Sequence, residues 1–189
     1  MNVQRPHLAA TRALIGQPQS RQRIPTPAAV LDLDAFDRNL ATMASRAKAA
    51  GLALRPHAKS HKCGAVAHRQ IEAGAVGICC AKLAEAEAMA AAGVGSIRVT
   101  SPIAGAVQAG RAARLAAQVA DFRIVVDHPD GAAELGAMSQ PMQVLIDVDP
   151  GMGRTGVHDA AQAVEVFRAI AARPNLQFLG VQCYGGHWQ

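Results

Sequence analysis

Short apolar runs alternate with alanine-rich segments along most of the chain, and this alternation limits the folds open to it. Segments with helical periodicity lie at 62–73, 82–92, 105–119, 129–138 and 159–172. The apolar runs beside them are GLALR (51–55), AVGICC (75–80), SIRVT (96–100), FRIVV (122–126), MQVLIDV (142–148) and LQFLGVQCY (176–184). Strands that alternate with helices of this length predict βαβ units and a parallel sheet. We interpret the runs as continuously apolar, which predicts strands buried on both faces.

A further strand is predicted at PAAVLDL (27–33), followed by a helix that Asp34 caps and that ends before Gly51. The apolar face of this helix would consist of Phe36, Leu40, Met43 and Ala47. Counting from residue 52 gives about six β/α repeats. A doubly wound sheet can stop at six strands, whereas a (β/α)8 barrel needs eight to close. The chain also ends directly after a predicted strand, which suggests part of a larger domain.

Charge and hydropathy exclude several classes of protein. No apolar stretch approaches the roughly 18 residues of a membrane span. The net charge is +5, but four arginines lie in the first 31 residues, which contain no acidic residue. Clusters of basic residues interleaved with aromatics are missing, so no nucleic-acid binding is expected.

The first 24 residues are predicted to form a leader that precedes a domain at 25–189. The leader lacks the apolar core of a secretory signal. Its acid-free, arginine-bearing composition also fits a transit peptide, but we interpret it as disordered. The cysteines show no C-x-x-C spacing, and free thiols fit a reducing, cytoplasmic compartment. These cysteines are Cys63, Cys79, Cys80 and Cys183.

The residues best suited to chemistry follow the predicted strands. Lys59 follows the first repeat strand, Ser101 the third, residues 149–156 the fifth and residues 184–187 the sixth. Parallel β/α folds place their sites at the carboxyl ends of the strands. We therefore expect these residues to meet at one mouth.

Lys59 lies in the stretch LRPHAKSHKC (54–63). A solvated loop lysine is the ordinary interpretation, but a lysine that forms a Schiff base needs a neutral amine, which partial burial and cationic neighbours favour. Such surroundings would come from Arg55, Lys62, His57 and His61. A metal site of His57, His61 and Cys63 is the alternative. Its H-x3-H-x-C spacing matches no usual zinc pattern and would leave Lys59 among the ligands, so no metal site is predicted.

GMGRTG (151–156) matches the G-x-G-x-x-G pattern of a dinucleotide-binding turn and follows a predicted strand. However, it opens the fifth repeat rather than the first, and the next strand ends without an acidic residue to hold a ribose. A glycine-rich strand-to-helix turn is therefore favoured. Arg154 in this turn, near Asp147 and Asp149, is well placed to bind an oxyanion.

The segment YGGHWQ brings together Tyr184, His187 and Trp188. Such aromatic residues either pack in a core or offer a stacking face to a planar cofactor. Taken alone, the segment favours the core interpretation.

Six stretches in this order resemble the D-threonine aldolase and D-serine dehydratase family. They are TPAAVLDLDAFDRNL, LRPHAKSHKC, IEAGAVGICCAKLAEAEAMAAAG, TSPI, VLIDVDPGMGRTGV and GVQCYGGHWQ. The resemblance covers about residues 25–189, and its R-P-H-A-K-[ST]-H-K part is highly specific. It implies a pyridoxal phosphate (PLP) binding (β/α)8 TIM-type barrel of the alanine racemase type, here truncated to about six repeats.

The resemblance also implies roles for individual residues. Lys59 would hold PLP as a Schiff base and act in catalysis, and Arg154 would contact the phenolic oxygen of the cofactor. Arg55 is a weaker candidate. The implied cofactor-binding residues are Lys59, Arg154, Tyr184, His187, His57 and Gln182. The CYGGHWQ segment departs from the shorter A-Y-H-G-type turn of many relatives.

The implied activity is that of a PLP-dependent lyase on D-β-hydroxy amino acids. A D-threonine aldolase-like cleavage to glycine and an aldehyde is favoured over the alternative, β-elimination by a D-serine or D-3-hydroxyaspartate dehydratase. A non-enzymatic PLP-binding protein or an inactive fragment is the alternative of another class. The full-length parent is expected to be a homodimer and to use a divalent metal, Mn or Zn, whose ligands lie outside this chain.

Overall fold

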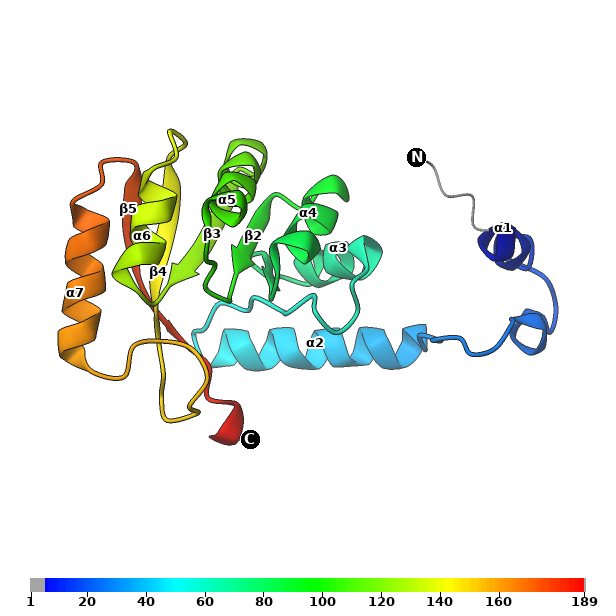
Figure 1. Ribbon diagram of the computed structural model, residues 1–189. Helices are drawn as coiled ribbons and strands as arrows, with labels where there is room; N and C mark the ends of the chain where they lie inside the picture. Colours follow the sequence, from blue (N-terminus) through cyan, green and yellow to red (C-terminus); the bar gives the residue numbers. More distant parts are fainter. Residues whose placement is uncertain (1–5, 189) are drawn as a thin grey trace. The chain divides into compact units, whose positions relative to one another are not determined.

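A parallel β-sheet forms the centre of the larger part of the chain (Figure 1). The computed structural model describes residues 6–188, and within them the strands pair in the order β1-β2-β3-β4-β5. Each neighbouring pair is parallel. The strands are β1 (Ile78–Cys80), β2 (Ser96–Val99), β3 (Asp121–Val126), β4 (Met142–Val148) and β5 (Leu176–Cys183). This order confirms the predicted parallel α/β class, because strands that follow one another in the chain are also neighbours in the sheet.

Helices precede or connect the strands and lie on one side of the sheet (Figure 1). They are α3 (Gly64–Glu72), α4 (Leu83–Ala91), α5 (Ala106–Gln118), α6 (Pro129–Gly136) and α7 (Ala160–Ala171). α4 packs on β1 and β2, α5 and α6 on β3, and α7 on β4 and β5. The helical segments expected from periodicity are thus confirmed. Within residues 6–188, no helix has both the length and the apolar character needed to cross a membrane.

Reciprocal side-chain contacts fix the start of α7. Asp159 Oδ1 accepts the Gln162 N–H at 2.8 Å, and Gln162 Oε1 accepts the His158 N–H at 2.8 Å. The first N–H groups of a helix have no partner within the helix, so this pair satisfies two donors near the helix start.

The chain divides into two compact units, Met1–Asn39 and Leu40–Gln189. In the first unit the structure has α1 (Pro6–Arg12), η1 (Ser20–Arg23) and the beginning of α2 (Leu33–Ala49). α1 and η1 lie in the leader for which the sequence predicted disorder, and residues 1–5 of that leader lie outside the described residues.

The prediction of a strand at 27–33 was wrong. This segment pairs with no described strand, and its Val30 and Leu31 are exposed. The helix begins at Leu33, because Asp32 Oδ1 accepts the Ala35 N–H at 2.9 Å and so caps the helix in place of Asp34. The predicted apolar face of α2 is not buried either, since no residue of the helix is buried.

β2 has one apolar and one polar face, which corrects for this strand the expectation that both faces are buried in apolar surroundings. Ile97 and Val99 of β2 are fully buried in the core, whereas Ser96 and Arg98 alternate with them and belong to the opposite, inner face. β1, β3 and β4 do bury apolar side chains on both faces, because Cys79, Val125 and Leu145 are buried on the face away from the helices. Large fully buried side chains include Ile78, Ile97, Leu115, Ile124, Leu135 and Ile170. Each contributes about 1.5–3 kcal/mol by leaving water. The hydrophobic core therefore lies mainly between the sheet and its helices.

The strand predicted at 51–55 is also absent as a regular element, so the sheet has five strands where six repeats were expected. An extended segment at 54–58 instead runs beside β1. Val76 N–H donates to Leu54 O at 2.9 Å, and Cys79 N–H donates to Pro56 O at 2.7 Å. The pairing between the two segments shifts by one residue between these bonds, and Pro56 has no N–H with which to continue a regular ladder. The two segments are therefore joined by an isolated bridge between His57 and Cys79 and do not form a continuous strand pair.

The inner face carries a cluster of ionic side chains near the amino ends of the strands. Asp121 accepts hydrogen bonds from Ser96 at 2.5 Å, from Arg55 at 3.3 Å and from Arg123 at 2.7 Å. A side chain at Gly77, where φ is +147°, would overlap Arg55 and Ser96. The absence of a side chain at Gly77 thus leaves room for the Arg55 side chain to reach Asp121 along the inner face.

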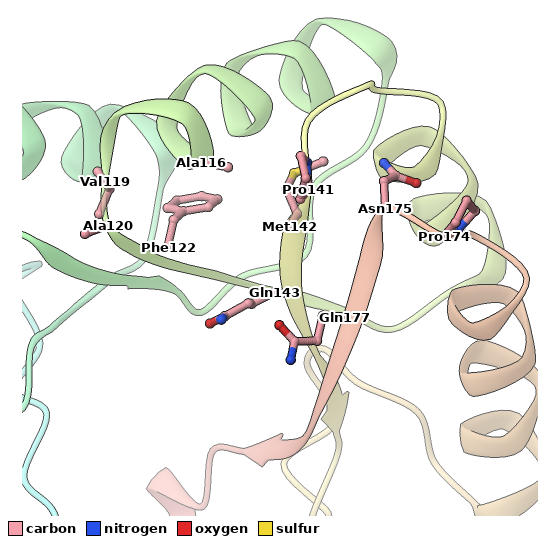
Figure 2. A pocket seen from close by; sticks show the side chains of 10 residues that line it. All are labelled: Ala116, Val119, Ala120, Phe122, Pro141, Met142, Gln143, Pro174, Asn175 and Gln177. Carbon is pink, nitrogen blue, oxygen red and sulfur yellow. The ribbon is translucent and has the colours of Figure 1, made fainter.

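A cavity lies at the amino ends of β3, β4 and β5 (Figure 2). The Phe122 ring lies toward α5, whereas Gln143 and Gln177 project from β4 and β5 away from the helices (Figure 2). The Gln143 Oε1 atom is buried without a hydrogen-bond partner. Polar side chains thus also occupy the inner face at the amino ends of β4 and β5.

Candidate functional site

A cavity of about 400 Å³ opens at the carboxyl ends of the strands. The segment before α3, the end of β2, the loop after β4 and the end of β5 all contribute to it. The lining residues are His57, Lys59, Cys79, Ala81, Arg98, Thr100, Ser101, Arg154, Thr155, Gln182, Cys183 and Tyr184. The residues that follow the predicted strands therefore meet at one mouth, as expected.

Two cations face the same aromatic ring in this cavity. The Lys59 Nζ atom lies 5.4 Å from the centroid of the Tyr184 ring, and the Arg154 Cζ atom lies 4.5 Å from it. Both distances fall within the range of cation–π attraction. Lys59, Arg154 and Tyr184 are all exposed, in contrast to the partial burial expected for Lys59 and the core position favoured for Tyr184.

His57 is held in one orientation on the chain just before Lys59. Its Nδ1 atom accepts the Lys59 N–H at 3.2 Å, and its Nε2 atom lies 3.2 Å from Thr100 Oγ1. The Thr100 hydroxyl donates to Cys80 O at 3.2 Å, so Nε2 must carry the proton that completes this chain. Burial, and then the charge of Lys59, lower the pKa of His57. His57 is thus a neutral residue that orients the backbone of Lys59.

The histidine and the cysteine that follow Lys59 do not converge on a metal position. His61 Nδ1 accepts the Cys63 N–H at 3.1 Å, and His61 Nε2 is buried without a partner. Within residues 6–188, no group of three or more histidine, cysteine, aspartate or glutamate side chains is arranged to hold a metal ion. All four cysteines are unpaired, as predicted.

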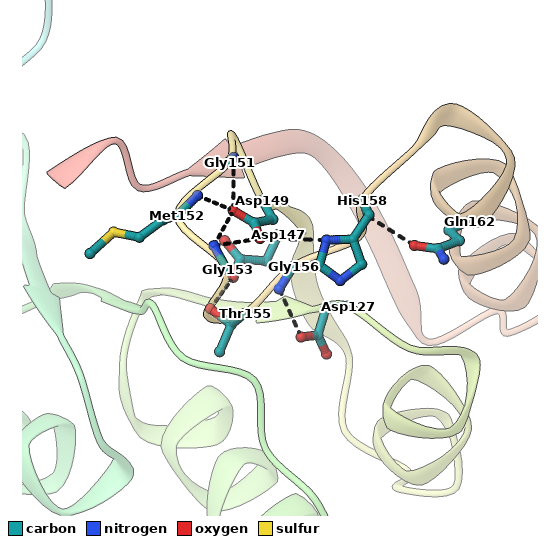
Figure 3. A network of polar contacts seen from close by, with 10 residues as sticks. All are labelled: Asp127, Asp147, Asp149, Gly151, Met152, Gly153, Thr155, Gly156, His158 and Gln162. Atoms are coloured by element: carbon teal, nitrogen blue, oxygen red, sulfur yellow. Dashed lines mark hydrogen bonds and ion pairs between the residues drawn. The ribbon is translucent and has the colours of Figure 1, made fainter. Parts of the chain in front are cut away.

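Asp149 organises the GMGRTG loop (Figure 3). Its carboxylate accepts the N–H groups of Gly151 at 2.9 Å, Met152 at 2.7 Å and Gly153 at 2.9 Å. Burial alone would raise the pKa of Asp149, but these bonds and nearby His158 lower it. Since the chain's own carboxylate already occupies these N–H groups, the loop is the predicted turn and not a pyrophosphate cradle.

Asp147 and Gln182 connect this loop to the neighbouring strands. Asp147 is 3% exposed and accepts hydrogen bonds from Thr155 Oγ1 at 2.8 Å and from Gln182 Nε2 at 3.1 Å. Gln182 Nε2 also donates to Thr100 O at 3.2 Å. Burial raises the pKa of Asp147, despite the bonds from Thr155 and Gln182. Gln182 therefore helps to build the wall of the cavity.

Two sequence candidates lie outside the cavity lining. His187 contacts the Trp188 ring, with 5.1 Å between ring centroids, and both side chains are exposed. Arg55 pairs with Asp121 on the inner face. The other five candidates line the cavity together, and they are Lys59, Arg154, Tyr184, His57 and Gln182.

Sequence reasoning missed Arg98, Thr100 and Cys79 as lining residues. The signal was present in SIRVT, where polar residues occupy every second position. Such alternation marks a strand with one apolar and one polar face. An arginine in the middle of a buried strand should therefore have indicated a functional inner face.

The fold and the cavity define a barrel-type β/α protein with a lysine-centred, cationic site at the carboxyl ends of its strands. Residues 31–188 match the alanine racemase N-terminal domain, and the chain belongs to this family.

Enzymes of known activity are among its relatives. It is 39% identical over 182 residues to a 3-hydroxy-D-aspartate aldolase from Paracoccus denitrificans, covering 94% of this chain and 46% of the relative. It is 38% identical over 136 residues to a D-threo-3-hydroxyaspartate dehydratase from Delftia sp., covering 70% of this chain and 36% of that enzyme. The crystal structure of D-threonine aldolase from Filomicrobium marinum superposes with a TM-score of 0.80 at 41% identity, over 84% of this chain and 44% of the aldolase.

The chain spans about half the length of the curated relatives it matches. The resemblance seen in the sequence is thus confirmed at the level of the family.

Proposed function

We propose that this chain is the lysine-bearing part of a PLP-dependent lyase that acts on D-β-hydroxy amino acids. The favoured reaction is a D-threonine aldolase-like cleavage to glycine and an aldehyde. One observation carries the proposal: Lys59 lines a cationic cavity in which its Nζ atom and the guanidinium of Arg154 both lie against the ring of Tyr184. The homology to aldolases of this class supports it.

The charges in the cavity fit the cofactor. Three lining residues are cationic, namely Lys59, Arg98 and Arg154, and no aspartate or glutamate lines the cavity. PLP carries an anionic phosphate and a phenolic oxygen on an aromatic ring. Lys59 would hold its aldehyde carbon through Nζ, Arg154 would bind the phenolic oxygen, and Tyr184 would contact the ring.

Bound there, PLP would supply the electron sink that stabilises a carbanion next to the amino group of the substrate. The chain's own residues would orient and exchange protons. His57 would position Lys59 rather than transfer a proton, because both of its ring nitrogens have partners. The Nζ atom of Lys59 and the hydroxyl of Tyr184 are the lining groups suited to move a proton.

Dehydration is the second candidate reaction, and the likeness to the dehydratase from Delftia sp. favours it. Lys59 and Arg154 would serve either reaction, since both must hold the same cofactor. Incubation with D-3-hydroxyaspartate distinguishes the two reactions. Glycine and an aldehyde would support the aldolase, and ammonia with a keto acid would support the dehydratase.

The test of the proposal is a covalent trap. The chain is incubated with PLP, reduced with borohydride and digested, and the modified peptide is identified by mass spectrometry. We expect one pyridoxyl adduct, on Lys59, that Lys59→Ala abolishes and Lys62→Ala leaves unchanged. Lys62 is the matched control because it lies three residues further along and does not line the cavity. Adducts spread over several lysines, or none on Lys59, would contradict the proposal.

A further inference from the structure

Arg98 is a cationic residue of the Lys59 cavity that has no assigned role. It lies on the inner face of β2, where its backbone is in register with Cys79 of β1 and Arg123 of β3. Its side chain reaches the cavity that Lys59 and Tyr184 also line. Any molecule that binds at Lys59 therefore enters the same space as this guanidinium.

The carboxylate nearest to Arg98 along the inner face already has its partners. Asp121 accepts hydrogen bonds from Ser96, Arg55 and Arg123. Arg55 and Arg123 each form an ion pair with it, whereas Arg98 forms none with any carboxylate of residues 6–188. Three arginines thus share one acidic neighbour, and Arg98 is the one left without a partner.

The polar groups on the other side of Arg98 have partners as well. Thr100 Oγ1 lies between His57 Nε2 and the Cys80 carbonyl. Asp147 receives hydrogen bonds from residues of the neighbouring loop and strand. Arg98 joins neither network, and its Nε atom is buried without a hydrogen-bond acceptor among the described residues.

Arg98 is half-buried, and a partly buried guanidinium without a counter-ion is unfavourable, because it has lost part of its hydration and gained no partner. Burial lowers the pKa of Arg98, and the charges of Arg55 and Arg123 act in the same direction. A guanidinium nevertheless keeps its proton in proteins, so the charge remains. An anion is the partner that best satisfies this charge, and the cavity is the route by which an anion reaches it.

We propose that Arg98 binds an oxyanion group, a carboxylate or a phosphate, of the molecule that occupies the Lys59 cavity. The proposal deepens the proposed function and rests on it for the identity of that molecule, but not for the anion contact. PLP would bring a phosphate, and a 3-hydroxyaspartate-type substrate would bring a side-chain carboxylate. A guanidinium matches both, because its parallel N–H donors fit two oxygens of one anion.

The first measurement compares Arg98→Met with Arg123→Met. Both variants remove one guanidinium from the same level of the inner face, but Arg123 is paired with Asp121 and does not line the cavity. Arg98→Met should be at least as stable as the wild type toward urea, since it removes an unpaired, half-buried charge, and Arg123→Met should be less stable. Unfolding of Arg98→Met would instead reveal a structural role and overturn the proposal.

Ligand titrations of the same proteins then identify the source of the anion. Loss of a hydrogen bond to a charged group should weaken binding about 10- to 100-fold. If Arg98 binds the phosphate, Arg98→Met loses affinity for PLP but not for pyridoxal. If it binds a carboxylate, PLP affinity stays and the PLP-loaded variant loses affinity for D-aspartate but not for D-alanine. Either result supports the proposal, and equal affinities in all four titrations overturn it.

Simple anions separate this proposal from the proposed function. Inorganic phosphate and succinate should stabilise the wild-type chain by binding its folded form, and should stabilise Arg98→Met less. This result would stand even if no PLP adduct formed on Lys59. Equal stabilisation of the wild type and Arg98→Met by both anions would contradict an anion site at Arg98, whatever the cofactor does.

Discussion

Gly156 closes the loop that carries Arg154, and its replacement by alanine should destabilise the chain far more than the same change at Gly153. At Gly156 φ is +105°, and an added Cβ would lie 2.5 Å from Asp149 N and 2.6 Å from the carbonyl carbon of Val148. These are backbone atoms. They cannot shift freely, because Asp149 N–H donates to Val157 O, and Val157 N–H donates to Asp147 O, each at 2.9 Å.

The magnitude follows from three contributions to the free energy of unfolding. A left-handed backbone costs an L-residue about 1–2 kcal/mol. Overlap in a packed region adds about 1–3 kcal/mol. The smaller entropy of the unfolded alanine chain offsets about 0.4–1 kcal/mol. Taking the middle of each range, Gly156→Ala should therefore cost about 3 kcal/mol. At Gly153 φ is +68° and nothing lies within 4 Å, so only the first and third contributions apply, giving about 1 kcal/mol or less.

Urea unfolding followed by far-ultraviolet circular dichroism measures this difference. With a slope of about 2 kcal/mol per M, the midpoint should fall by about 1–2 M for Gly156→Ala and by about 0.5 M or less for Gly153→Ala. Equal shifts in the two variants would refute the argument, because both glycines lie in the same loop and both have positive φ. A Gly156→Ala midpoint at the wild-type value would show that the loop can open without cost.

Two further perturbations test the local geometry. Asp159→Ala should lower the free energy of unfolding by about 1 kcal/mol through loss of the α7 cap, and Asp159→Asn should retain most of it because asparagine caps equally well; equal losses in urea unfolding would argue against the cap. The wild-type chain should also lose stability as the pH falls below 6.5, the ordinary pKa of histidine, because the unfolded chain then takes up a proton at His57 before the folded chain does. The contribution of His57 to this loss should stop below its folded-state pKa and be absent from His57→Asn, so parallel pH profiles of the two proteins near pH 6.5 would contradict it.

The sequence predicted the elements whose formation depends on local pattern. The helices between residues 64 and 171 were predicted from their periodicity and the five strands from their apolar runs, because both patterns reflect burial between the sheet and its helices. The two predicted strands that are absent, at 27–33 and 51–55, have the right composition but no continuous ladder with a neighbour. Strand formation depends on such a partner, which a single sequence does not reveal.

The candidate site was predictable to a similar extent. Arg154 and Tyr184 could be located because they follow strands that end at one edge of the sheet, and Lys59 because it follows an extended segment that runs beside β1. Arg98 was missed because the strands were interpreted as apolar runs rather than as alternating ones. The capture of three N–H groups by Asp149 explains why GMGRTG is not a nucleotide turn, and that contact becomes visible only in three dimensions.

The alternation of the strand residues has a consequence for how such a protein can change. In β2, Ile97 and Val99 are buried in the core between the sheet and its helices, and Arg98 between them lines the cavity. A substitution at Ile97 or Val99 alters the packing of the core, whereas a substitution at Arg98 alters the surroundings of the ligand. New specificities can therefore arise by single replacements on the cavity side, while the packing that keeps the chain folded is inherited unchanged.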